Sequence, residues 1–377
     1  WDAMNPRTAQ REIPAGVVGV GTAWALTLGS AGLFVFSAAM LALPPGYRGI
    51  APDLRGYGGA DPAARIDATR GMRDFVDDLL ALMDHLGYDD FHIVGISLGG
   101  LVVWWMMADA PHRLSSVTLA GPGSPFGFGG TKGADGTPTT PDFAGSGGGL
   151  INPDLIRSLL DGDRDSISDF SPRGIMRRLV WGEGLIPERE DALIDAMFRV
   201  HIGDRQLPGD HEASPNWPYV RPGKWGATNA MSPMYVGNLV DRILAAEPKA
   251  DALWAYGAED VAVCNSAGSD PGTWGPTGRL PGFPGSDAYP CHPMMDQIRK
   301  MLEDYAAAGG SYDEAAVPEE PEQTAPRRIV SLAASSTASG NSSSSPYPKR
   351  IERTSTPGSV MGPRTRSTSP MGLSFLS

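Results

Sequence analysis

The most constraining feature of the sequence is a serine placed between two apolar segments. Residues 91–96 form an apolar run with the length of a buried strand, and residues 98–110 are apolar all round, which indicates a buried helix. Ser97 joins them in the pattern Gly95-Ile96-Ser97-Leu98-Gly99. We expect a sharp strand-to-helix turn here. Both glycines are required in this prediction, because a Cβ at either position would strike the adjoining backbone.

A serine on such a turn is placed for nucleophilic chemistry. The helix begins at Leu98, so its first amides and its dipole face the serine oxygen and can stabilise an oxyanion. The alternative is an ordinary N-cap serine, whose hydroxyl only accepts a hydrogen bond from the following backbone. The five-residue pattern arises readily by chance in a chain with 48 glycines. Its position between a strand and a helix therefore carries the prediction.

Strand and helix patterns alternate around this turn. Strand-length runs occur at 47–54, 91–96, 117–120, 252–256 and 312–317, and helical spacing of apolar residues occurs at 72–86, 98–110 and 294–305. Residues 23–28 and 33–43 add a further strand and helix, separated by a glycine turn. Such alternation is typical of a parallel sheet covered by helices on both faces, so we predict an α/β protein.

The sequence resembles the α/β-hydrolase fold family over roughly residues 23–317. The resemblance is carried by Asp53-Leu54-Arg55-Gly56-Tyr57-Gly58, by Gly95-Ile96-Ser97-Leu98-Gly99-Gly100, and by the order of strands around them. It implies a mostly parallel sheet with helices on both faces and a helical cap inserted at 121–250. It also implies hydrolysis of a carboxylic ester, lactone or amide by a serine nucleophile, because dehalogenase and epoxide-hydrolase relatives use a carboxylate in that place.

The resemblance also implies roles for individual residues. Ser97 would attack the carbonyl, while the backbone N–H groups of Leu98 and of the loop at Gly29 and Ser30 would hold the oxyanion. The family's acid follows a later strand, where Gly257-Ala258-Glu259-Asp260 occurs. Asp260 is the expected acid and Glu259 its nearest rival. No metal or cofactor is implied.

Three aromatic residues of the expected cap have two competing interpretations. They are Trp217, Tyr219 and Trp225, spaced by prolines and glycines. They either line an apolar pocket for a small-molecule substrate or pin an irregular loop to the core.

The catalytic base is the main departure from the family pattern. The family supplies a histidine after the last strand, but no histidine occurs beyond His292. His292 precedes the last predicted helix, and His201 and His211 lie in the insertion. We therefore expect little or no triad-type esterase activity from this chain. Two alternatives stay open, a non-catalytic or degenerate homologue that binds a ligand and an incomplete gene product.

Composition divides the chain into five parts. We expect an N-terminal extension at 1–22, the two parts of the core at 23–120 and 251–317, the cap at 121–250, and a disordered Ser/Thr/Pro-rich basic tail at 318–377. The net charge of −12 lacks the electrostatic footprint of a nucleic-acid binder. Because the chain starts at Trp1 and few residues precede the first predicted strand, we also expect the family's first sheet edge to be incomplete.

Residues 15–43 make a membrane anchor a competing possibility. They contain no charged residue and are long enough to span a bilayer. Their Gly, Ala, Thr and Ser content favours a buried strand, turn and helix instead. Two cysteines exclude a disulfide scaffold. We expect a cytoplasmic protein with a small-molecule substrate and no nucleic-acid partner, and the sequence does not set its oligomeric state.

Overall fold

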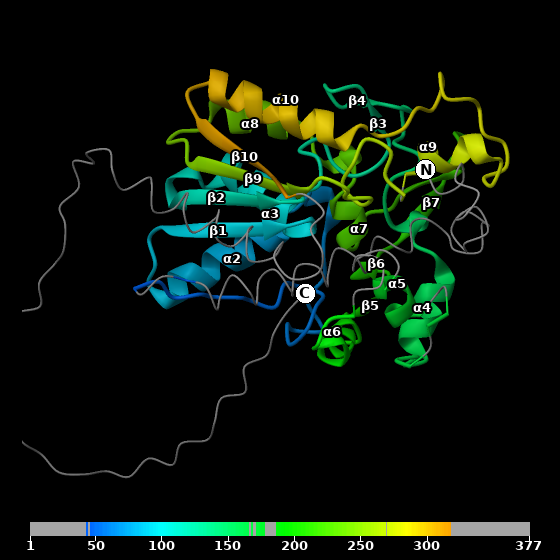
Figure 1. The fold of residues 1–377 in the computed structure, drawn as a ribbon, viewed down its shortest axis with the longest axis horizontal. Helices are drawn as coiled ribbons and strands as arrows, with labels where there is room; N and C mark the ends of the chain where they lie inside the picture. Colours follow the sequence, from blue (N-terminus) through cyan, green and yellow to red (C-terminus); the bar gives the residue numbers. More distant parts are fainter. Residues whose placement is uncertain are drawn as a thin grey trace, which may run out of the picture.

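A four-stranded sheet forms the centre of the protein (Figure 1). The computed structural model describes residue 43 and residues 46–165, 167–168, 171–177, 186–268 and 270–317. The strands are β1 (Phe91–Ile96), β2 (Leu114–Ala120), β9 (Asp251–Gly257) and β10 (Ser311–Val317), paired in the order β1-β2-β9-β10. All three pairings are parallel, so the strands end at the same edge. The predicted α/β class and parallel sheet are confirmed.

Four helices pack together against one face of this sheet. They are α2 (Arg73–Leu86), α3 (Leu98–Asp109), α8 (Leu239–Ala245) and α10 (Met294–Ala307), and each contacts the next in that order. Their buried side chains share one core cluster with alternate strand residues such as Val117, Leu119 and Trp254. The intervening residues Leu253 and Ala255 belong to a separate cluster on the opposite face. The helix predicted over 33–43 lies outside the described residues, apart from Leu43.

The core helices occur where the spacing of apolar residues predicts them. α2 ends at Gly87, whose φ of 76° is the left-handed conformation that commonly closes a helix. The predicted strand at 47–54 is wrong, because residues 46–54 adopt no regular structure. A strand needs a neighbour to complete its hydrogen bonds, and none of the described strands pairs with residues 47–54. Tyr47 instead packs on His92, with ring centroids 5.6 Å apart.

A long insertion separates the adjacent strands β2 and β9. Its helices are α4 (Pro153–Leu160), α5 (Pro172–Ile175), α6 (Glu190–Met197) and α7 (Ala227–Ala230), with α8 at its end. The helix starts predicted at Asn152 and Ser171 are confirmed, because their side chains accept hydrogen bonds from the amides of Asp154 and Gly174. α6 is shorter than the predicted 187–201. α7 and α8 join the main core cluster, so the last part of the insertion packs with the sheet domain.

Short elements complete the described chain. Three two-stranded pieces pair β3 (Thr131–Lys132) with β4 (Thr137–Pro138), β5 (Ile202–Gly203) with β6 (Leu207–Pro208), and β7 (His211–Ala213) with β8 (Val220–Pro222). The remaining helix is α9 (Pro271–Trp274), and 3-10 turns occupy Ala68–Arg70, Pro111–Arg113, Gly148–Leu150, Pro233–Tyr235 and Gly275–Thr277. None of the helices in the described ranges is long and apolar enough to cross a membrane. The candidate anchor at 15–43 lies outside those ranges, apart from Leu43.

Backbone hydrogen bonds join the loop before α2 to the insertion. They run from Gly58 N to Arg199 O (2.9 Å), from His201 N to Gly56 O (2.8 Å), from Ile66 N to Arg205 O (3.0 Å) and from Ala68 N to Lys224 O (2.9 Å). Backbone groups have few other partners in irregular segments, so these bonds give the loop a defined path. These hydrogen bonds therefore attach the loop to the insertion.

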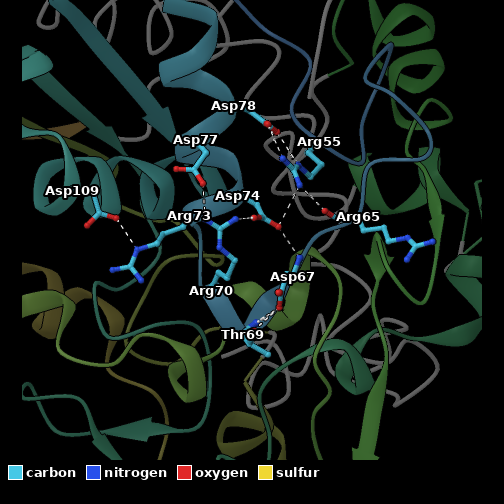
Figure 2. A network of polar contacts seen from close by, with 10 residues as sticks. All are labelled: Arg55, Arg65, Asp67, Thr69, Arg70, Arg73, Asp74, Asp77, Asp78 and Asp109. Atoms are coloured by element: carbon cyan, nitrogen blue, oxygen red, sulfur yellow. Dashed lines mark hydrogen bonds and ion pairs between the residues drawn. The ribbon is translucent and has the colours of Figure 1, made fainter.

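Ion pairs hold the Arg55 turn against the first turns of α2 (Figure 2). Arg55 Nε and Nη2 donate to the two carboxylate oxygens of Asp78 at 2.9 and 2.7 Å. Asp74 is 2% exposed and accepts a hydrogen bond from the Asp67 amide at 2.8 Å. The same carboxylate forms ion pairs with Arg70 and Arg55. Figure 2 shows Asp74 at the centre of these contacts, so it is the member whose loss leaves the most groups unpaired.

Replacing the central carboxylate should destabilise the protein more than replacing an exposed neighbour. We expect Asp74→Ala to lower the free energy of unfolding by about 2–3 kcal/mol, because it removes a buried carboxylate that the Asp67 amide and two guanidinium groups share. Asp77 also pairs with Arg70 but its side chain is 55% exposed. Asp77→Ala should therefore change stability by about 0.5 kcal/mol or less. Urea unfolding measures both, and equal losses would contradict the central role of Asp74.

Candidate active site

Ser97 lies on a strained turn between β1 and α3. Its φ of 53° and ψ of −109° belong to a region that non-glycine residues rarely adopt. Two backbone hydrogen bonds hold the turn against the end of β2: Ser97 N donates to Ala120 O at 3.1 Å, and Gly123 N donates to Ser97 O at 3.3 Å. Strain of this kind persists only where the surrounding structure imposes it, and it is often associated with function.

The Ser97 side chain does not act as a helix cap. Ser97 occupies the N-cap position of α3, yet its hydroxyl accepts no capping hydrogen bond. The N-cap residues Asn152 and Ser171 of α4 and α5 do accept one. Leu98 is the first residue of α3, so its amide has no acceptor within the helix. The arrangement leaves a hydroxyl and an amide donor next to each other at a helix N-terminus, where the dipole favours negative charge.

The glycines around Ser97 differ in what they contribute. A Cβ on Gly95 would lie 2.4 Å from Gly99 O, and a Cβ on Gly100 would lie 2.5 Å from Pro122 Cβ. Both positions therefore need glycine for close packing. A Cβ on Gly99 meets nothing within 4 Å, so the prediction that Gly99 is sterically required is wrong. The close contact made by Gly99 is with its backbone oxygen, whereas its missing side chain faces open space.

Asp260 follows β9 at the same edge of the sheet. Its Oδ1 accepts hydrogen bonds from the amides of Ala262 and Val263 at 2.7 and 3.0 Å, which orients the carboxylate. Burial raises the pKa of Asp260 above its ordinary value, and these two amides lower it by a smaller amount. The adjacent Glu259 is exposed, whereas Asp260 is half-buried. Of the two carboxylates, Asp260 has the held and desolvated environment expected of a catalytic acid.

β2 lies between the strands that carry Ser97 and Asp260. Two strand spacings separate β1 from β9, or about 10 Å between strand axes. Gly121 directly follows β2, and a Cβ built on it lies 3.4 Å from Asp260 Oδ2. Ser97 is bonded to Ala120, the residue before Gly121. The end of β2 thus lies between the strands that carry the two residues, with Gly121 close to the Asp260 carboxylate.

His292 is held in a buried hydrogen-bond network of its own. It is 1% exposed, its Nδ1 accepts a hydrogen bond from Gly129 N at 3.1 Å, and its Nε2 lies 2.8 Å from Gln297 Oε1. Burial lowers the pKa of His292 to about 4. The imidazole is therefore neutral and carries its proton on Nε2, which donates to Gln297. Neither nitrogen is free to take a proton from Ser97.

Of the other five histidines, two make hydrogen-bond contacts elsewhere and three are exposed. His92 Nδ1 lies 2.7 Å from Ser116 Oγ, and His201 Nε2 lies 3.4 Å from Gly58 O. The exposed histidines are His85, His112 and His211. All six histidines belong to the described residues, and none of them is hydrogen-bonded there to Ser97 or Asp260.

The three aromatic residues of the insertion do not form a common group. Trp217 is 6% exposed and packs on Phe283 and Tyr289, with ring centroids 5.1 and 4.7 Å away. Tyr219 is 52% exposed, and Trp225 stacks under the guanidinium of Arg205. The contacts of Trp217 are those of a loop anchor. A substrate-binding role for Tyr219 and Trp225 stays a prediction, as does the oxyanion role of Gly29 and Ser30, which lie outside the described residues.

A buried polar network surrounds His292. Asp270 is 3% exposed, and its Oδ2 accepts a hydrogen bond from His292 N at 2.7 Å. Burial raises the pKa of Asp270 to about 6. Gln297 is fully buried and accepts from Ser124 Oγ at 2.5 Å. No local pattern predicts this network, because Gly129 and Ser124 lie more than 160 residues from the His292 and Gln297 side chains that they contact. Within the ranges that the structure describes, no cluster of His, Cys, Asp or Glu could hold a metal ion.

Comparison with known proteins agrees with the fold and the turn. Residues 28–136 match the family model described as alpha/beta hydrolase fold. A 72-residue segment, 19% of this chain, is 38% identical to 22% of the length of epoxide hydrolase 2 from Siraitia grosvenorii. A 78-residue segment, 21% of this chain, is 38% identical to 27% of the length of 2-hydroxy-6-oxo-6-phenylhexa-2,4-dienoate hydrolase from Burkholderia cepacia. Each match thus spans about a quarter of the relative.

Among solved structures, an esterase from Exiguobacterium antarcticum aligns with 81% of this chain and 87% of its own. Its identity is 15% and its TM-score 0.43. The family-model match covers the helix α2, the strands β1 and β2 and the Ser97 turn. The fold that this match identifies is the α/β-hydrolase fold.

The two glycines of the serine turn should respond differently to substitution. We expect Gly95→Ala to lower the free energy of unfolding by about 3 kcal/mol, because the new Cβ collides with backbone that cannot move freely. Gly99→Ala is the matched control and should change stability by about 1 kcal/mol or less, because its Cβ meets open space. Chemical denaturation measures both variants. Similar losses in both would show that the turn is not packed as described.

The buried network should make stability depend on pH in two opposing ways. His292 resists protonation down to a pKa of about 4 in the folded chain, whereas an unfolded histidine titrates near 6.5. Its contribution to stability is therefore lost as the pH falls from about 6.5 to 4. Asp270 takes a proton at about pH 6 when folded but only near 3.9 when unfolded. The contribution of Asp270 to stability therefore rises as the pH falls from about 6 to about 3.9. This range overlaps the range over which His292 loses its contribution.

Asp270→Asn should reveal the loss of stability that accompanies protonation of His292, because the opposing titration of Asp270 is removed. We expect the free energy of unfolding of this variant to fall more steeply than that of the wild type between pH 6.5 and 4.5, as measured by urea unfolding at several pH values. Asp77→Asn is the exposed control and should keep the wild-type profile. A profile of Asp270→Asn parallel to that of the wild type would rule out the titration of Asp270.

Proposed function

We propose that Ser97 and Asp260 are the nucleophile and the acid of a serine-hydrolase site for a carboxylic ester, lactone or amide. The observation that carries this proposal is the strained, uncapped Ser97 at the N-terminus of α3. A serine that only capped the helix would adopt extended backbone and bond the amides ahead of it. The serine also distinguishes this chain from hydrolases that use a carboxylate at this position.

In this proposal, Ser97 supplies the nucleophile and the N-terminus of α3 stabilises the negative charge that develops. Ser97 Oγ attacks the carbonyl carbon, and the carbonyl oxygen gains the electron pair as an oxyanion. The Leu98 amide and the α3 dipole stabilise that charge. The leaving alcohol or amine departs with a proton, and water then releases the acid from the acyl-serine. Asp260, held by the amides of Ala262 and Val263, orients the base that moves these protons.

Among the described residues, no histidine contacts Ser97 or Asp260 as a base would. His292 has both nitrogens in hydrogen bonds, and the other five histidines contact neither Ser97 nor Asp260 among the described residues. Loss of the imidazole from a serine triad lowers turnover by about 10⁶-fold. We therefore propose very low turnover. The same observation favours a second candidate function, a degenerate homologue that binds a small molecule without turning it over. The names of the relatives, an epoxide hydrolase and a hexadienoate hydrolase, support a small-molecule ligand in either case.

Added imidazole should restore part of the missing step. We expect the purified protein to hydrolyse an activated aryl ester barely above the buffer rate, and to accelerate when free imidazole is supplied as the base. The acceleration is measured after subtracting the reaction of imidazole with the ester in solution. Ser97→Ala should show none of it, because the nucleophile is absent. A fluorophosphonate should label Ser97 faster when imidazole is present.

Two outcomes would count against the proposal. Imidazole acceleration of equal size in Ser97→Ala would show that Ser97 is not the nucleophile. Robust turnover without imidazole that disappears in Ser97→Ala would show that the chain has a base of its own, and His292→Ala, His201→Ala and His211→Ala would then identify it. Asp260→Asn, beside Glu259→Gln as its control, tests the acid, since only the former should weaken the imidazole effect.

A further inference from the structure

The segment that follows β2 packs on the turn of the candidate nucleophile. Residues 121–133 of this segment are here called the β2 loop. Gly123 N donates a hydrogen bond to Ser97 O at 3.3 Å. Pro122 packs on the first turn of α3, because a Cβ on Gly100 would lie 2.5 Å from Pro122 Cβ. The position of the strained Ser97 turn therefore depends on where the β2 loop lies.

A buried glutamine of α10 holds the next residue of this loop. Ser124 directly follows Gly123, and its Oγ donates to Gln297 Oε1 at 2.5 Å. Gln297 Nε2 donates to Thr131 Oγ1 at 3.1 Å and to Gly133 O at 2.9 Å. Ser124, Thr131 and Gln297 are each at most 1% exposed. One buried side chain thus contacts the β2 loop near both of its ends.

The hydrogen bonds of Gln297 use the whole capacity of its amide group. Gly133 O can only accept, so it faces the Nε2 group, and Oε1 faces Ser124 and His292. His292 reaches the β2 loop as well, because its Nδ1 accepts from Gly129 N at 3.1 Å. The Gln297 amide therefore has one orientation, and it cannot turn without leaving a buried donor or acceptor unpaired.

We propose that Gln297 is a positioning residue for the Ser97 site, an inference that rests on the proposed hydrolytic function. In the described part of the chain no hydrogen bond joins Gln297 to Ser97 or Asp260, so it acts through Ser124 and the β2 loop. The unusual backbone angles of Ser97 persist only while the packing around the turn imposes them. Release of the loop would let the turn relax and would move Ser97 Oγ and the Leu98 amide away from the substrate carbonyl.

Two variants test this role without relying on hydrolysis. Gln297→Met removes all four hydrogen bonds of the amide, whereas Ser124→Ala removes a single hydroxyl and is the milder change. In both variants of the full chain, we expect the backbone amides of residues 97–101 and 121–127 to exchange with deuterium about 10-fold faster than in the wild type under native conditions. Mass spectrometry of the peptides that cover these residues measures the exchange.

Ser171→Ala is the matched control for Ser124→Ala. The Ser171 hydroxyl is equally buried, but it donates to Ser168 O and accepts from Gly174 N at the start of α5. This variant should leave the exchange of both peptides at the wild-type rate.

The imidazole-dependent hydrolysis of the aryl ester supplies a second readout. We expect kcat to fall about 10- to 100-fold in Ser124→Ala with little change in KM, because misplacement of the nucleophile slows the chemical step rather than binding. A merely structural role would lower the rate only in proportion to the folded fraction, which circular dichroism measures. Ser171→Ala should retain the wild-type kcat.

Two outcomes would overturn the inference. They are wild-type exchange rates at the Ser97 turn in folded Ser124→Ala and Gln297→Met, and an unchanged kcat in Ser124→Ala. Absence of any Ser97-dependent hydrolysis in the wild type would contradict the proposed function instead. Deuterium exchange would then still decide whether Gln297 holds the turn.

Discussion

The close approach of β1 to the first turn of α3 is the constraint on which the candidate site depends. Gly95 lies against the backbone of Gly99, and Gly100 lies against Pro122, so the helix starts immediately where the strand ends. Ser97 has no room for ordinary backbone angles at this junction, and its hydrogen bond to Ala120 holds it in the left-handed region. The same geometry keeps its side chain from capping the helix. Sheet packing therefore determines what the serine hydroxyl is free to do.

Asp260 depends on the sheet in a different way. β9 brings the residue to the correct edge, but two amides of the following turn hold the carboxylate in place. The parallel order of β1, β2 and β9 then fixes the spacing of the two side chains. Neither residue relies on the insertion beyond residue 133 for its position among the described contacts. The insertion is joined instead to the loop before α2, through backbone hydrogen bonds at Gly58, Ile66 and Ala68.

Local patterns predict the parts of this protein that local forces determine. The strand at 91–96, the helix at 98–109 and the caps at Asn152 and Ser171 follow from apolar runs and short-range hydrogen bonds. The predicted strand at 47–54 fails, because a strand depends on a neighbour that its own residues do not specify. The prediction that Gly99 is sterically required is also wrong. The direction in which a Cβ would point from this residue depends on how the turn is packed. Spacing alone does not contain that information.

The buried position of His292 illustrates the same limit at the site. Its place after β9 and before α10 makes it a candidate base, but its contact with Gln297 spans only 5 residues, whereas its contact with Gly129 spans 163 residues. With this long-range partner, both ring nitrogens of His292 take part in hydrogen bonds. A histidine's neighbours in space, rather than its order in the chain, decide whether it serves the scaffold or the chemistry.

The open space beside Gly99 has a consequence for how such turns are recognised. Gly95 and Gly100 both pack too closely on their neighbours to accept a side chain. Substitution at these two positions is therefore limited by the need to fold. Position 99 carries no such limit, and a small side chain there would extend away from the protein backbone. A motif that demands glycine at both flanks therefore treats two unlike positions as equal. A search that permits other small residues at the second flank, and asks for glycine one residue later, would follow the physical requirement of this turn more closely.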